Sequence, residues 1–183
     1  MSNKLKELTW AHHQAAERRA FARDLIKGTI DPHKYYTFLV CQHYNYKALE
    51  DATEIPEDLE AIKRADLILE DIEELEKMYN FERPTDLPQS VADYVSHIYD
   101  LEDEGDNEKL LAHMYTRHFG ELHGGQIIKK KIPGSGKMYE FDVDKQYLID
   151  EFRLLLHDGM ADEAKICFEF ASRLFDELSE EKD

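Results

Sequence analysis

Histidines are the residues of this chain best suited to bind a metal, and the sequence contains nine of them. Imidazole nitrogen is a common ligand of zinc, copper and iron. Di-iron helical bundles need Glu-x-x-His pairs on inward helix faces, and the sequence has no such pair. The spacing of zinc fingers and of H-E-x-x-H peptidases is also absent. Two places remain for metal chemistry: His12 with His13, and His118 with His123.

The neighbouring histidines His12 and His13 lie in a segment with a helical repeat. At about 100° per residue, His12 falls within the apolar stripe that begins at Leu5, and His13 lies at the edge of that stripe. Glu17 follows His13 by one helical turn, where a carboxylate can orient a metal-bound imidazole through its second nitrogen. Periodicity therefore favours His12 as a ligand and the carboxylate favours His13, so the residues alone leave both open.

The segment 118–126 reads HFGELHGGQ and lies within an otherwise helical pattern from about residue 110 to 131. Each glycine inside a helix costs roughly 1 kcal/mol relative to alanine, yet this helix would contain Gly120, Gly124 and Gly125. Gly120 and Gly124 share one helix face, and Gly125 adjoins it. A face without side chains lets the backbone approach a large flat partner, and it also allows the helix to kink.

A bare helix face has two explanations: tight packing against another helix, or room for a ligand. Polar side chains flank this face, which a purely apolar packing seam would not favour; they are Tyr115, Thr116, Arg117 and Glu121. We therefore predict a planar ligand held between two helices, one supplying a histidine and the other a bare backbone. Haem has this shape.

The elements that must position these residues are all predicted to be helices. Apolar residues recur at three- and four-residue steps, and period-two alternation is nearly absent. The clearest stripes contain Leu67, Ile68, Ile72 and Leu75; Val91, Tyr94, Val95 and Ile98; and Phe168, Ala171, Phe175 and Leu178. Asp31 before Pro32 predicts a helix start, and Gly28 predicts a helix end. We expect an all-α fold with a kinked, glycine-rich helix.

Length and composition limit the class of protein. A chain of 183 residues with 42 % hydrophobic residues suits one domain, which we expect to span residues 1–183 with short polar termini at about 1–4 and 179–183. The formal net charge of −17 argues against nonspecific binding to nucleic acid or anionic membranes. Neither a signal peptide nor a membrane span is evident, and the two cysteines lie far apart. These features predict a soluble cytoplasmic protein.

Four long segments occur in an order that matches one protein family. Residues 115–130 read YTRHFGELHGGQIIKK, which is similar to the signature Y-T-R-x-x-G-D-L-S-G-G-Q-x-x-K-K. Residues 12–28 read HHQAAERRAFARDLIKG and contain the same His-to-Glu spacing of four as the family's proximal segment. RADLILEDI at 64–72 and DEAKICFEFASRLFDEL at 162–178 match later stretches. On these motifs the chain is identified as a member of the biliverdin-producing haem oxygenases.

The resemblance implies roles for individual residues. It decides between the two histidines in favour of His13, the implied axial ligand of the haem iron, with Glu17 beside it. The implied haem-binding positions are Lys6, Tyr115 and Arg153 near the propionates, Thr116, Gly120, Gly124 and Gly125 on the glycine-rich helix, and Phe168 on the pocket wall. The implied catalytic positions are Tyr46, Arg117, Gly120 and Glu121.

Two positions depart from the family signature. The family's distal aspartate is Glu121 here, and the small residue two positions on is His123. The aspartate acts through ordered water, and glutamate is one methylene longer, so we expect activity to be retained with an altered rate or some leakage of peroxide. Because residues 121 and 123 differ by about 200° around a helix, we expect His123 to turn away from the haem and to be partly exposed.

The resemblance implies an enzyme for which haem is both substrate and cofactor. Such an oxygenase uses O2 and an external electron donor to convert haem to biliverdin, Fe2+ and CO. We expect a soluble donor such as a ferredoxin, and a bilin reductase is a candidate downstream partner. A basic patch in the acidic chain consists of Lys129, Lys130, Lys131 and Lys137. These lysines either dock the donor or complement a helix dipole.

Two other functions fit parts of the sequence. A haem carrier or sensor would use the same pocket without degrading its ligand. Glu121 in place of aspartate keeps that alternative open, whereas Arg117, Tyr46 and Gly120 argue against it. A thiaminase-like helical enzyme would need a cysteine nucleophile with a base, and the sequence shows no base partner for Cys167.

Overall fold

The structure is a computed structural model that describes residues 3–180, so residues 1–2 and 181–183 of the predicted polar termini lie outside the described residues. Within that range the chain forms eight α-helices and three short 3-10 helices and no strand, which confirms the all-α prediction. The α-helices are α1 (Asn3–Glu17), α2 (Ala20–Lys27), α3 (Pro32–Ala52), α4 (Ala65–Tyr79), α5 (Gln89–Asp103), α6 (Asn107–Lys129), α7 (Lys145–Arg153) and α8 (Ala161–Glu180). The 3-10 helices are η1 (Glu57–Ile62), η2 (Lys137–Tyr139) and η3 (Asp158–Met160).

Local chemistry explains where two of these helices begin and end. The side chain of Asp31 accepts hydrogen bonds from the backbone N–H groups of His33 (3.0 Å) and Lys34 (3.2 Å), and Pro32 is the first residue of α3. This N-cap arrangement is the one that the sequence predicts. Gly28 ends α2 with φ = +76°, a left-handed conformation that glycine adopts without steric cost.

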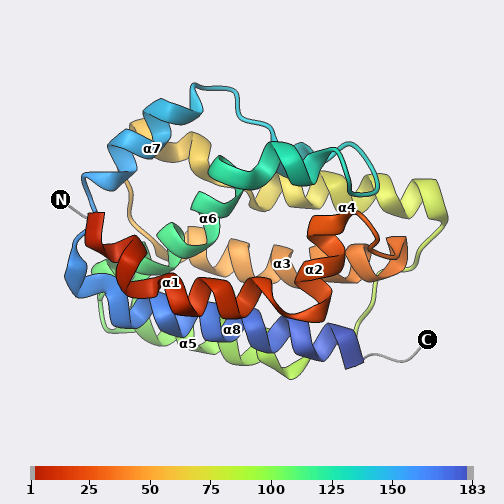
Figure 1. The fold of residues 1–183 in the computed structure, drawn as a ribbon, viewed down its shortest axis with the longest axis horizontal. Helices are drawn as coiled ribbons and strands as arrows, with labels where there is room; N and C mark the ends of the chain where they lie inside the picture. Colours follow the sequence, from red (N-terminus) through yellow and green to blue (C-terminus); the bar gives the residue numbers. More distant parts are fainter. Residues whose placement is uncertain (1–2, 181–183) are drawn as a thin grey trace.

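Helix α3 lies at the centre of the fold. It contacts α4, α5 and α6, and most of its side chains are buried. Figure 1 shows α1, α8 and α5 running side by side below α3, whereas α6 crosses the molecule and changes direction along its length. Helix α1 packs mainly against α8. Helix α6 also packs on α8, so the helix that carries the histidine pair and the helix that carries the glycines share this neighbour.

Helix α4 holds the segment that follows α6. The guanidinium of Arg64, at the start of α4, donates hydrogen bonds to the backbone carbonyls of Met138 (3.2 Å) and Glu140 (2.5 Å). Further along α4, the carboxylate of Asp71 accepts hydrogen bonds from the N–H groups of Lys137 (2.9 Å) and Met138 (3.0 Å). Both side chains belong to the RADLILEDI segment. This segment therefore fixes the chain just beyond the glycine-rich helix.

The N-cap of α3 yields a direct test. Asp31→Ala removes the acceptor for two backbone N–H groups and is expected to lower the free energy of unfolding by about 1 kcal/mol. Asp31→Asn keeps an acceptor oxygen and is expected to change it by less than about half of that amount. Urea unfolding followed by circular dichroism measures both. Equal losses in the two variants would show that the cap contributes nothing specific.

Candidate functional site

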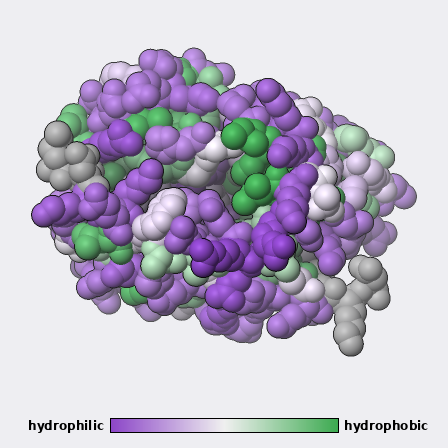
Figure 2. All heavy atoms as spheres, in the orientation of Figure 1, coloured by the Kyte–Doolittle hydropathy of each residue, from purple (hydrophilic) through white to green (hydrophobic). Residues whose placement is uncertain are grey.

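The open face of α6 is formed by Gly120 and Gly124. Among the described residues, and apart from the glycine, its two chain neighbours and the adjacent backbone of α6, no atom lies within 4 Å of the place where a β-carbon would stand at either position. Figure 2 shows that the molecule is hollowed between α1 and this part of α6. A side chain at either glycine would project into open space. The two glycines therefore leave room for a flat ligand against the helix backbone.

Gly125 has a different role. A β-carbon here would stand 2.8 Å from Cδ1 of Tyr139, whose ring is buried. The side-chain amide of Gln126 also donates a hydrogen bond to the carbonyl of Tyr139 (3.0 Å). The structure places Gly125 in the packing of α6 against the following segment, beside the open face, and the haem-binding role that the resemblance implies for it stays a prediction. The reason for this packing is steric, since only glycine lets the Tyr139 ring approach this closely.

The two histidines of α1 have different surroundings. Nε2 of His13 lies 2.6 Å from Oε1 of Glu17, so the contact expected from their spacing is present. The His13 ring also lies 5.4 Å from the ring of Phe168 on α8, between ring centroids. Nε2 of His12 lies 3.4 Å from Oε1 of Glu169, an exposed carboxylate of α8. Thus His13 has the carboxylate and aromatic neighbours that the resemblance implies, and His12 has a surface partner.

Glu121 lies beside the open face, in contact with α3. It is buried, and the hydroxyl of Tyr46 donates a 2.5 Å hydrogen bond to its Oε1. Burial raises the pKa of Glu121, and the proximity of His118 and the hydrogen bond from Tyr46 offset this only in part. Burial and the neighbouring Glu121 likewise raise the pKa of Tyr46. The carboxylate of Glu121 is thus bonded directly to the tyrosine hydroxyl.

Arg117 supplies a buried positive charge beside this pair. Its Nε donates a hydrogen bond to the hydroxyl oxygen of Tyr94 (3.0 Å), and its Nη1 donates to Oε1 of Gln42 (3.4 Å). The guanidinium carbon also lies 4.2 Å from the centre of the Tyr94 ring, a cation–π distance. The backbone carbonyl of Arg117 accepts a 3.4 Å hydrogen bond from Tyr46. Arg117 therefore connects α6 to both α3 and α5.

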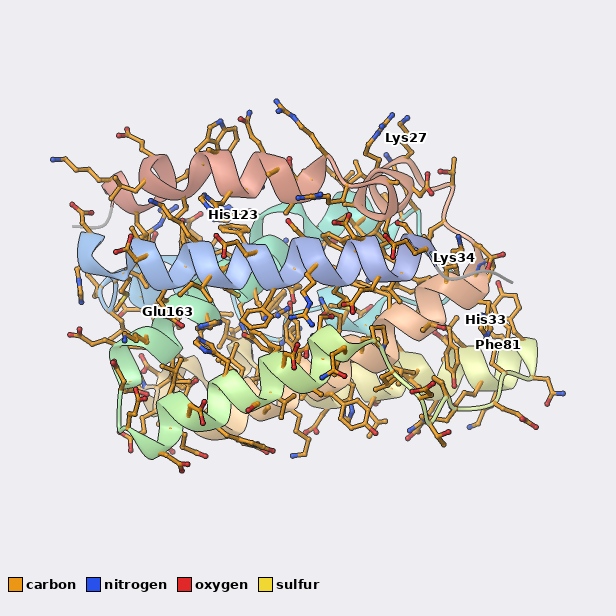
Figure 3. The ribbon with its side chains drawn as sticks, turned by 90° about the horizontal axis from the view of Figure 1, so that it is seen from below. Lys27, His33, Lys34, Phe81, His123 and Glu163 are labelled. Atoms are coloured by element: carbon orange, nitrogen blue, oxygen red, sulfur yellow. The ribbon has the colours of Figure 1, made fainter. Side chains whose placement is uncertain are left out.

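The remaining predicted residues lie at the edge of the site or within the helix. Lys6 and Arg153 are exposed, and Tyr115 is half-buried. His123 is exposed but lies near both cations. Partial burial of its ring and the positive charges of Arg153 and Lys6 lower the pKa of His123. Figure 3 shows this histidine on the side toward α1. The hydroxyl of Thr116 donates to the carbonyl of Ala112 (3.0 Å) and is thus engaged in its own helix.

No base partner for Cys167 is evident in the sequence, but the structure provides one. The thiol is buried, with its Sγ 3.9 Å from the Tyr94 hydroxyl. Burial raises the pKa of Cys167, but Arg117 and His113 outweigh it and bring the pKa down to about 7. Because the thiol has no exposed surface, a substrate cannot reach it in this conformation. A thiaminase-like enzyme would thus have a base, His113, beside Cys167, but its nucleophile would not be accessible to a substrate.

Sequence reasoning missed a second group of polar residues behind Arg117. Tyr94, His113 and Glu163 are buried and hydrogen-bonded to one another in a chain, and His97 joins the chain at Glu163. They come from three helices, so no local spacing reveals them. One signal was available, since His113 precedes Arg117 by four residues and so shares its helix face.

The glycines of α6 can be distinguished by alanine substitution. Without ligand, Gly120→Ala is expected to raise the free energy of unfolding by about 1 kcal/mol, because alanine favours the helix and meets open space. Gly125→Ala gains the same propensity but pushes against Tyr139, and overpacking costs about 1–3 kcal/mol. It is expected to be neutral or destabilising in the same urea titration. Equal stabilisation of both variants would contradict the assignment of the two glycines to different faces.

Comparisons with known proteins bear on the family. The family profile described as "Heme oxygenase" matches residues 1–177. "Heme oxygenase 2" of Oryctolagus cuniculus is 27 % identical over 209 residues, and the match covers 98 % of this chain and 66 % of that relative. The chain thus spans slightly less than two thirds of the length of that relative. Within residues 3–180, none of the helices is both long and apolar enough to cross a membrane.

Two solved structures share the fold. The haem oxygenase of Leptospira interrogans is 28 % identical, with a TM-score of 0.82 over 97 % of this chain and 100 % of that chain. Heme oxygenase-2 of Synechocystis sp., solved in complex with haem and NO, is 27 % identical, with a TM-score of 0.78 over 96 % of this chain and 83 % of that chain. With a family profile that matches nearly the whole sequence and an all-helical fold in common, the chain belongs to the haem oxygenase family.

Proposed function

We propose that this protein is an oxygenase that cleaves haem to biliverdin, Fe2+ and CO, using O2 and an external electron donor. The observation that carries the proposal is the bare face of α6, where Gly120 and Gly124 meet open space. Haem would lie between this face and α1. When bound, its iron would supply the centre at which O2 is activated.

His13 is the proposed axial ligand of the iron. Glu17 occupies one nitrogen of its ring at 2.6 Å, which leaves the other nitrogen for the metal. A carboxylate that accepts the ring N–H fixes the tautomer and the orientation of a metal-bound imidazole. Phe168 limits movement of the ring on the side of α8.

Glu121, Tyr46 and Arg117 are proposed to control protons on the distal side. Because its pKa is raised, Glu121 retains a proton to a higher pH than an exposed glutamate does. Tyr46 holds its carboxylate in place, and Arg117 supplies a fixed positive charge nearby. The group can therefore hold or release a proton beside the glycine face.

The cations at the edge of the site are proposed to bind the haem propionates. Lys6 comes from α1, and Arg153 comes from the end of α7. Tyr115 lies close enough to Arg153 for that charge to influence its pKa. Carboxylates at this edge would meet two positive charges and a hydroxyl group, which is favourable electrostatically and fixes the rotation of the ring in its plane.

Replacement of each histidine of α1 tests the ligand. His13→Ala is expected to weaken haem binding by about tenfold or more and to shift the Soret band, because the iron loses its protein ligand. His12→Ala is the matched control and is expected to change neither. Titration of the purified protein with ferric haem measures both. The opposite result would make His12 the ligand, as its place in the apolar stripe suggests.

Turnover in air distinguishes the oxygenase from a haem carrier. With a ferredoxin reducing system and catalase present, the Soret band of the wild-type complex should disappear while the absorption of biliverdin grows. A stable Soret band despite reduction of the iron would favour the carrier, and Glu121 would then be the residue to examine. Failure to bind haem at all would remove the proposed function.

We further propose that the electron donor is a soluble, acidic protein such as a ferredoxin, docked at the basic patch. The chain has a net charge of −17, so an acidic donor needs a local positive surface. In the patch, Lys129 pairs with Glu140 (2.7 Å) and Lys137 approaches Glu70 (3.9 Å). Lys130 is exposed at the end of α6 and is therefore the lysine best placed to meet a partner.

Charge reversal at Lys130 tests the docking site. Lys130→Glu is expected to raise the KM for ferredoxin roughly tenfold at low salt, because a charge at the rim of an interface acts mainly on association. Lys109→Glu, at the opposite end of α6, is the matched control. Turnover driven by ascorbate should be unchanged in both variants. An unchanged KM in Lys130→Glu would remove the docking site and leave the helix-dipole explanation.

A further inference from the structure

A chain of hydrogen bonds leads from the protein surface to Arg117. Nε2 of His97 lies 2.5 Å from Oε1 of Glu163, and Nε2 of His113 lies 2.8 Å from the same oxygen. Nδ1 of His113 lies 2.9 Å from the hydroxyl of Tyr94, which accepts from Nε of Arg117 at 3.0 Å. The His97 side chain is 28 % exposed and that of His113 is 0 % exposed. Figure 3 shows Glu163 near the start of α8, from where it joins α5 and α6.

When His113 is neutral, the chemistry of the two ends sets the direction of every bond in this chain. Arg117 can only donate, so the oxygen of Tyr94 accepts and its proton is free for Nδ1 of His113. Neutral His113 then carries its own proton on Nε2, which donates to Glu163. Burial tends to raise the pKa of Glu163, but the hydrogen bonds from His113 and His97 outweigh it and lower the pKa to about 2. The carboxylate is therefore ionised and acts as the final acceptor.

A protonated His113 would reverse part of the chain. Both ring nitrogens would then donate, so the Tyr94 oxygen would receive two hydrogen bonds and its proton would turn to Sγ of Cys167, 3.9 Å away. Tyr94 would still hold Arg117. The groups that face His113 are Tyr94 and His97 on α5, Glu163 and Cys167 on α8, and Arg117 on its own helix.

We propose that Glu163 and His113 are positioning residues for Arg117, holding Tyr94 in the orientation that accepts the Nε–H of Arg117. The proposal rests on the proposed function for its effect on turnover, because Arg117 lies beside the Tyr46–Glu121 pair. The arrangement itself can be tested without haem. A displaced Arg117 guanidinium would change the electrostatic environment of Tyr46, whose ring centre is 5.7 Å away.

A divalent metal could also use His97, His113 and Glu163, since their ligand atoms lie within 4.8 Å of one another. The distances favour hydrogen bonds instead. Two ligand atoms about 2.0–2.1 Å from a tetrahedral zinc ion stand about 3.3 Å apart, whereas the two N···O distances here are 2.5 and 2.8 Å. Binding of a metal ion by His97, His113 and Glu163 would therefore overturn the proposal.

The test uses the full chain labelled with 15N in histidine and arginine, without haem and above the pKa of His113. In the wild type, His113 should be the Nε2–H tautomer, and the Nε–H of Arg117 should exchange slowly with water. Glu163→Gln should give a mixture of His113 tautomers and speed exchange of the Arg117 Nε–H by about tenfold or more. The signals are assigned by their absence in His113→Gln and Arg117→Lys.

Glu50→Gln is the matched control. Glu50 is also a buried carboxylate bonded to a buried histidine of α6, His118, at 2.7 Å, but it does not join the chain to Arg117. Its substitution should leave the His113 tautomer and the Arg117 exchange rate unchanged. Equal effects of Glu50→Gln and Glu163→Gln would indicate general loosening of the fold and would overturn the proposal.

A second variant covers the case in which Glu163→Gln does not fold. Tyr94→Phe removes the connecting hydroxyl but keeps the ring, so Arg117 exchange should speed up while His113 remains the Nε2–H tautomer, held by Glu163. Unchanged exchange in this variant, or stoichiometric binding of Zn2+ by the wild type through His113, would overturn the proposal.

In the haem complex, Glu163→Gln should lower kcat and leave the affinity for haem unchanged. If the wild-type protein does not degrade haem, the proposed function fails. The tautomer and exchange measurements without haem still show whether Glu163 and His113 position Arg117.

Discussion

The main physical constraint on this fold is that α6 must remain helical although one of its faces has no side chains. A helix normally gains its stability in a protein by packing an apolar face, and the face with Gly120 and Gly124 cannot provide such packing. Side chains of α6 next to these glycines and around the rest of the helix compensate through buried polar contacts to three other helices. These contacts pair His118 with Glu50 of α3, Glu121 with Tyr46 of α3, Arg117 with Tyr94 of α5, and His113 with Glu163 of α8.

The same constraint explains why a segment away from the glycine face resembles the family signature. The side chains of Arg64 and Asp71 bind the backbone of residues 137–140. This fixes Tyr139 against Gly125 and so supports α6 just after its weakest part. Glu50 also accepts hydrogen bonds from the N–H groups of Arg64 (2.6 Å) and Ala65 (2.9 Å), which joins the start of α4 to the support of α6.

The sequence was informative wherever the controlling chemistry is local. The start of α3 at Asp31, the end of α2 at Gly28 and the contact between His13 and Glu17 depend on residues at most a few positions apart. The polar chain behind Arg117 could not be predicted, because Tyr94 and Glu163 are 69 positions apart and meet only through tertiary packing. The packing role of Gly125 was hidden for the same reason, since its neighbour Tyr139 belongs to a different element.

The bare face of α6 also bears on selectivity among tetrapyrroles. The backbone at Gly120 and Gly124 selects a macrocycle only by its thickness and flatness. It has no side chain there that could distinguish vinyl, ethyl or methyl substituents on the periphery. Under the proposed function, discrimination would come from the edge where Lys6 and Arg153 lie, and from the proposed histidine ligand on α1. Iron-free or metal-substituted porphyrins with two propionates therefore satisfy the same shape requirement as haem, and they would compete for the site according to their axial chemistry alone.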